Sequence, residues 1–88
     1  MNHGERTAVV TELPALARSY EIEGISVTVR GFLVNEHHPR YEIVLRGGGQ
    51  IAIVDVPVHE HGSLEERVEQ ALSGFVAAIR SRGQASNS

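Results

Sequence analysis

The sequence predicts an α+β fold: an antiparallel β-meander of three or four strands, a long C-terminal amphipathic helix packed on one face, and a short N-terminal helix. Segments rich in β-branched residues follow one another with short connections that contain Gly or Pro, which is typical of antiparallel strands. One stretch near the C-terminus instead has apolar residues at helical spacing. A chain of 88 residues suffices for one domain but not two. We therefore expect a single domain over residues 1–82 and a disordered polar tail over residues 83–88.

The short N-terminal helix is expected over residues 11–19, TELPALARS. Thr11 can cap it, and Pro14 is tolerated because the N–H groups of a first helical turn have no partner within the helix. Leu13 and Leu16 fall on one face at helical spacing. The preceding segment, TAVV over residues 7–10, has strand character but is short.

The strands of the meander are expected over residues 20–34, 41–46 and 50–58. Gly24 interrupts the first segment, which is therefore either one long bent strand or a hairpin. NEHHPR, residues 35–40, is a loop because Asn and Pro favour turns. GGG, residues 47–49, is expected to be a three-residue hairpin turn, which places Arg46 opposite Gln50.

The C-terminal helix has both a start signal and a stop signal. Ser63 followed by Glu66 is a capping box, in which each side chain accepts a hydrogen bond from a backbone N–H at the helix start. Gly83 is expected to end the helix. Between them, the apolar residues recur every three or four positions and predict a stripe that packs on the sheet; they are Leu64, Val68, Leu72, Phe75, Val76 and Ile79.

The last strand is apolar on both faces over part of its length. Ile51 and Ile53 point one way, whereas Ala52, Val54, Val56 and Val58 point the other way. An antiparallel sheet that is covered on one side only has a polar outer face. Either the N-terminal segment or another subunit must therefore cover the second face. The short N-terminal helix is too small for this task, so we expect a homodimer.

Composition excludes several kinds of site. The chain has 11 acidic residues, 8 basic residues that are all Arg, and a formal charge of −3. It has no Cys, which excludes disulfides, thiolate metal sites and cysteine nucleophiles. No signal segment and no apolar run of membrane-spanning length are evident, so a cytoplasmic protein without membrane contact is expected.

The predicted order of short helix, three strands and helix resembles that of the double-stranded-RNA-binding fold. That family contacts RNA through a basic cluster at the start of its last helix. This chain has SLEERVEQ there, and its three glutamates would repel phosphate. No nucleic-acid partner is therefore expected.

Histidines are the only concentration of candidate ligands. In a meander the loop 35–40 and the segment 57–63 lie at the same end of the sheet, and the expected register places His37 opposite His59 and His38 opposite Val58. His37, His38, His59 and His61 could then bind zinc or nickel, with Glu36 or Glu60 adding a carboxylate. The alternatives are a solvated polar loop and a cluster that responds to pH near 6. No other cofactor is expected.

Nothing in the sequence points to catalysis, so we expect a non-catalytic protein and assign no catalytic or cofactor-binding residue. No serine lies in a nucleophile motif. RGGGQ is followed by a strand, unlike a phosphate-binding loop, which leads into a helix. Asp55 is expected to form a hydrogen bond or ion pair with Tyr41 or Arg40.

Two function classes remain open. The first is a protein-interaction or homo-assembly module, in which an unknown protein partner is a further option. The second is a small-ligand or divalent-metal-binding protein that uses the histidine-rich edge formed by the loops 35–40 and 57–63.

Overall fold

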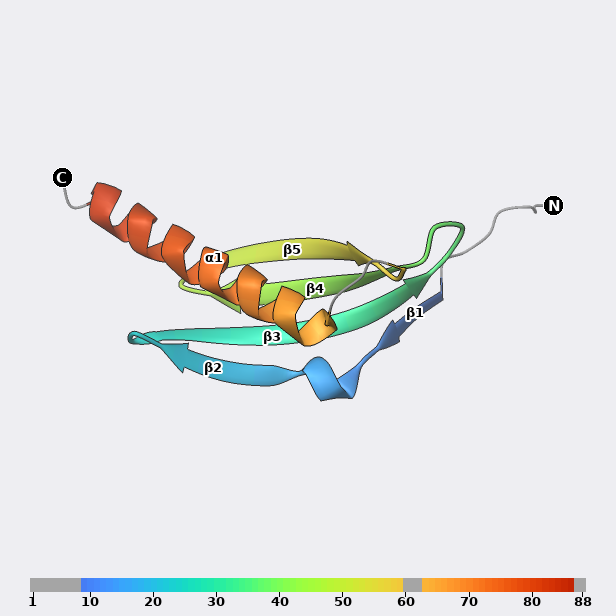
Figure 1. Ribbon diagram of the computed structural model, residues 1–88. Helices are drawn as coiled ribbons and strands as arrows, with labels where there is room; N and C mark the ends of the chain where they lie inside the picture. The colour runs from blue at the N-terminus through green and yellow to red at the C-terminus, as the bar shows by residue number, and fades with distance from the viewer. Residues whose placement is uncertain (1–8, 60–62, 87–88) are drawn as a thin grey trace.

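The computed structural model describes residues 9–59 and 63–86, which form one antiparallel sheet and one long helix (Figure 1). This arrangement confirms the α+β class. In chain order the elements are β1 (Val9–Glu12), a 3₁₀ turn (Pro14–Leu16), β2 (Arg18–Ile22), β3 (Ile25–Asn35), β4 (Arg40–Gly47), β5 (Gln50–Pro57) and α1 (Leu64–Ser86). Strands β3, β4 and β5 are consecutive neighbours, as expected for a meander, while β1 and β2 both pair with the other side of β3. Within the described residues, no helix is long and apolar enough to cross a membrane.

Two tight hairpins set the register of the sheet. Glu23 and Gly24 connect β2 to β3, and Gly48 and Gly49 connect β4 to β5; all four residues have positive φ. Positive φ at both central residues defines the turn that matches the twist of paired strands. The segment 20–34 is therefore a hairpin and not one bent strand. The expected three-residue turn at 47–49 is wrong, because Gly47 belongs to β4 and faces Gln50.

The expected helix over residues 11–19 is also wrong. The segment forms β1, a single 3₁₀ turn and β2, and both strands pair antiparallel with β3. Backbone pairing along the 11 residues of β3 outweighs the weak local preference for a helix. The element order therefore differs from that of the double-stranded-RNA-binding fold.

The bend between β1 and β2 lies against Gly31 of β3. The N–H of Leu13 donates to the carbonyl oxygen of Gly31 at 2.8 Å. A Cβ at Gly31 would overlap the side chain of Leu16, so the glycine leaves the space that Leu16 occupies beside the core. The polypeptide can thus change from β1 to β2 without leaving β3.

The start of α1 is capped as the sequence predicts. The Ser63 hydroxyl oxygen accepts hydrogen bonds from the N–H groups of Glu65 at 3.1 Å and Glu66 at 3.4 Å. The reciprocal bond from the Ser63 N–H to the Glu66 carboxylate is not formed among the described residues. The helix continues through Gly83 to Ser86, so the expected end at Gly83 is wrong. One helical glycine costs only about 1 kcal/mol relative to alanine, which does not by itself end a helix.

Ser63→Ala is expected to lower the free energy of unfolding by about 1 kcal/mol, because two backbone N–H groups lose their side-chain acceptor. Urea denaturation followed by circular dichroism measures this loss. Ser63→Asp is the matched control, since aspartate also accepts hydrogen bonds at a helix start and should retain most of the stability. An unchanged denaturation midpoint in the alanine variant would contradict the cap.

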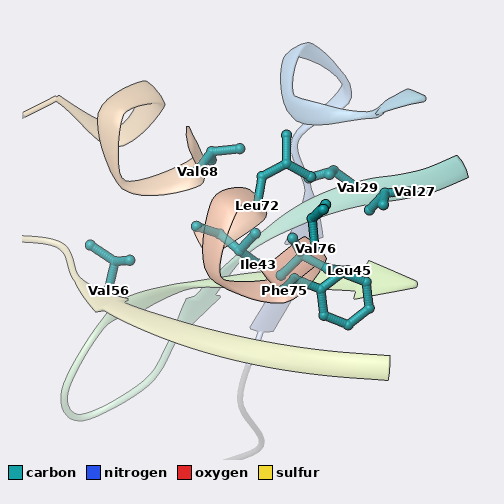
Figure 2. Packing of buried hydrophobic residues seen from close by; sticks show 9 residues of the cluster. All are labelled: Val27, Val29, Ile43, Leu45, Val56, Val68, Leu72, Phe75 and Val76. Atoms are coloured by element: carbon teal, nitrogen blue, oxygen red, sulfur yellow. The ribbon is translucent and has the colours of Figure 1, made fainter. Parts of the chain in front are cut away.

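The core lies between α1 and one face of β3, β4 and β5 (Figure 2). Ile43 and Leu45 of β4 are fully buried at its centre. The apolar stripe of α1 packs against Ile43 and Leu45, as the spacing of its residues predicts. The cluster consists of Val27, Val29, Ile43, Leu45, Val56, Val68, Leu72, Phe75 and Val76.

The second face of the sheet has no cover within the described residues. The N-terminal segment runs as β1 and β2 along the edge of β3, so it widens the sheet and does not lie over that face. Figure 1 shows α1 on one side of the sheet only. Of the two expectations for what covers this face, the N-terminal segment is therefore excluded for the residues from 9 onward.

Candidate functional site

The histidine-bearing segments meet at one end of the sheet, but in a different pairing from the expected one. The β4–β5 ladder ends at Arg40 opposite Pro57, and the Val58 N–H donates to the carbonyl oxygen of Pro39 at 3.4 Å. Continuing this register places His38, not His37, opposite His59. The shift by one residue follows from the two-residue turn at the other end of the hairpin. His61 lies outside the described residues.

A hollow of about 400 Å³ forms between these segments. It is lined by His38, Pro39, Arg40, Asp55, Pro57 and His59. His37 instead packs edge-on against His38, with ring centroids 4.6 Å apart. Two of the four predicted histidines therefore share one cavity, and a third lies next to it.

Arg40 is the electrostatic centre of this end of the sheet. Its guanidinium is hydrogen-bonded to the Glu36 carboxylate and lies 3.8 Å from Glu42 and 3.5 Å from Asp55. The hydrogen bond to Glu36, and then the charges of Asp55 and Glu42, raise the pKa of Arg40 above its ordinary value. Asp55 is thus an ion-pair partner, as expected. Three carboxylates around one cation leave the cluster negative, which opposes binding of an anion.

Metal binding by the histidines stays a prediction. Among residues 9–59 and 63–86, no three His, Asp or Glu side chains lie close enough together to hold a metal ion. The full set of His37, His38, His59 and His61 includes a residue outside this part of the chain. His38 and His59 are the two members that the described residues bring together.

The uncovered face of the sheet carries apolar side chains beside β5 and again at Val10 and Val34 near β1, with charged side chains between them. Ile51 and Ile53 are 58% and 59% exposed there, although both belong to a strand. Val44 faces Ile53 across the β4–β5 ladder, and Arg46 faces Ile51. Further along the face, Arg30 is paired with Glu12 at 2.8 Å and its hydrogen bond lowers the pKa of that carboxyl. Val44, Ile51 and Ile53 form what we call the β5 patch.

The sequence placed Ile51 and Ile53 together on one face of the last strand, but it did not indicate which face α1 covers or that the outer edge of β5 could pair. The sheet order ends at β5, so within the described residues one side of this strand has no neighbour. The signal was present in Pro57, since proline is confined to edge strands or strand ends.

A groove between β2 and α1 was also missed, because the sequence did not place β2 beside the helix. Ile22, Leu72 and Val76 line it, and an ion pair between Glu23 and Arg80 lies at one end. Gly24, as the turn of a hairpin, was the feature of the sequence that could have indicated the strand β2 before it.

Comparison of the chain with protein-family models, curated proteins and solved structures finds no match.

Proposed function

We propose that this protein is a non-catalytic assembly module that forms a homodimer through the uncovered side of its sheet. The observation that carries the proposal is the exposure of Ile51 and Ile53 side by side on β5. The cytoplasmic location expected from the sequence is part of the proposal, as is the option of a further protein partner.

The β5 patch supports self-association on energetic grounds. Burial of a large aliphatic side chain contributes about 1.5–3 kcal/mol, and both isoleucines are more than half exposed in the single chain. Contiguous exposed apolar surface of this kind marks interaction sites in proteins. Of the charged residues on this face, Arg30 and Arg40 have carboxylate partners within the chain, whereas Arg46, which faces Ile51, has none among the described residues.

The test is the molecular mass in solution across a range of concentrations, measured by sedimentation equilibrium. We expect a dimer, and we expect Ile51→Glu to raise its dissociation constant at least about tenfold, since it places a charge in apolar contact. Ala78→Glu is the matched control, because Ala78 is exposed on α1, on the other side of the molecule. A monomer at all concentrations, or equal weakening by both variants, would contradict the proposal.

A second candidate function is binding of a small ligand or a divalent cation in the hollow beside His38 and His59. The size of this cavity and its two imidazoles favour it. Neutral imidazole nitrogens are good ligands for zinc and nickel. The negative cluster around Arg40 would attract a cation.

Zinc titration followed by histidine side-chain NMR tests this second function. If the hollow binds zinc, the His38 and His59 resonances shift together at micromolar metal, and the melting temperature rises by mass action. His59→Ala should abolish both effects, whereas Ser63→Ala should leave the zinc response intact. Histidines that titrate independently and do not respond to zinc would exclude the site.

A further inference from the structure

The free side of β5 presents a regular row of backbone hydrogen-bonding groups. The Val58 N–H points toward β4, where it meets the Pro39 carbonyl oxygen. Backbone groups of successive residues in an antiparallel pair alternate between the two sides of a strand. Ile51, Ile53 and Asp55 therefore direct their N–H and C=O groups away from β4, toward the side on which no strand of the described residues lies. Pro57 occupies the same kind of position, where its missing N–H costs no bond to β4.

We infer that β5 pairs antiparallel with β5 of a second copy, about a twofold axis at Ile53, so that the two sheets become one. This inference rests on the proposed self-association and specifies its geometry. The backbone groups of Ile51, Ile53 and Asp55, which point away from β4 on each copy, then form the new ladder. The unpaired N–H and C=O groups of an edge strand are the template for such pairing.

The chemistry of β5 favours its own copy as the partner. Native edge strands commonly avoid association by means of lysine, proline, charged side chains or bulges; residues 51–54 have none of these, and Asp55 and Pro57 lie toward one end of β5. With the axis at Ile53, Ile53 faces itself and Ile51 faces Asp55 of the second copy. Pro57 then falls beyond the ladder, where it removes no hydrogen bond.

The side chains on the uncovered face agree with this register. Val44 and Ile53 of one copy continue into Ile53 and Val44 of the second, which gives an unbroken apolar row across the junction. Arg46 forms no ion pair within the described chain. It lies two strands from Asp55 of the second copy, about 10 Å between backbones, which long side chains can span. If the axis shifts by one residue in either direction, Arg46 and Asp55 of the second copy no longer lie in line across the strands.

Disulfide cross-linking tests the inference directly, because the chain contains no cysteine. In an antiparallel hydrogen-bonded pair the Cα atoms are about 5.5 Å apart, within the range that a disulfide spans. We expect Ile53→Cys to form a covalent dimer under mild oxidation on a non-reducing gel. Thr28→Cys and Ser19→Cys are the controls. Both lie on the same face of the sheet as Ile53, Thr28 on the central strand β3 and Ser19 on the opposite edge strand β2. All three positions are exposed, so the variants should fold, which thermal melting verifies.

The outcomes separate the inference from the proposed function. A solution dimer that cross-links at residue 28 or 19, or that fails to cross-link at 53, overturns the β5 pairing and leaves self-association intact. A chain that is monomeric at all concentrations overturns both.

Mixed single-cysteine variants then test the register. Ile51→Cys mixed with Asp55→Cys should give a mixed disulfide, because the axis at Ile53 places these residues opposite each other. An axis at Ala52 would instead cross-link residue 51 with 53, and an axis at Val54 would cross-link 53 with 55. Dominance of either of those pairs would overturn the register centred on Ile53.

Discussion

Replacing Phe75 with alanine is expected to lower the free energy of unfolding by about 3–5 kcal/mol, the usual cost of removing a buried aromatic ring. Phe75 is 7% exposed and belongs to the cluster between α1 and the sheet (Figure 2). In a domain of this size, each kcal/mol lowers the melting temperature by about 4–8 °C. The melting temperature should therefore fall by more than about 10 °C, and this change can be measured by calorimetry or by circular dichroism.

Leu72→Ala should have a comparable effect of about 2–5 kcal/mol, since Leu72 is 6% exposed in the same cluster. Ser73→Ala is the matched control, because Ser73 is its exposed neighbour on the helix and should change stability by less than about 0.5 kcal/mol. Losses below about 0.5 kcal/mol at both Phe75 and Leu72 would mean that α1 does not pack on the sheet.

Gly47→Ala is expected to destabilise the protein by about 1–3 kcal/mol, the usual cost of forcing atoms into a packed site. A Cβ at this position would lie 2.5 Å from the carbonyl oxygen of Ser26 and 3.3 Å from the Cα of Val27. Both are backbone atoms of β3, so the clash is relieved only if the strand itself moves. Chemical denaturation of the purified variant measures the loss.

Gly74→Ala is the control that makes this result specific. Gly74 lies inside α1, and a Cβ there would meet nothing within 4 Å. The same substitution should therefore stabilise the protein by about 0.5–1 kcal/mol, through the better helix propensity of alanine. Changes of the same sign at the two glycines would contradict the close approach of Gly47 to β3.

The histidine end of the sheet illustrates how far topology alone could be predicted. Short connections required consecutive strands to be neighbours, which correctly brought the loop before β4 and the residues after β5 together. The pairing of His38 with His59 depended on turn length, and three consecutive glycines permit either a two-residue or a three-residue turn. A difference of one residue exchanged His37 for His38 and moved Asp55 from Tyr41 to Glu42.

The sequence by itself determined the strands β3, β4 and β5, the helix stripe and the cap at Ser63, because each follows from residues that are close together along the chain. Hydrophobic periodicity and capping are local properties, and over these longer segments the tertiary structure agrees with them. The choice of face was not local. β5 is apolar on both sides, and only packing against α1 decided that Val56 is buried and Ile53 is exposed.

Tertiary structure alone also decided the N-terminal segment. TELPALARS has the spacing of a short helix, yet an isolated helix of this length is marginal. The free edge of β3 offers backbone partners over a much longer stretch, and Gly31 leaves room for Leu16 where β1 passes into β2. The same backbone pairing occupies one edge of the sheet and leaves β5 as the other edge, where we propose that a second copy joins.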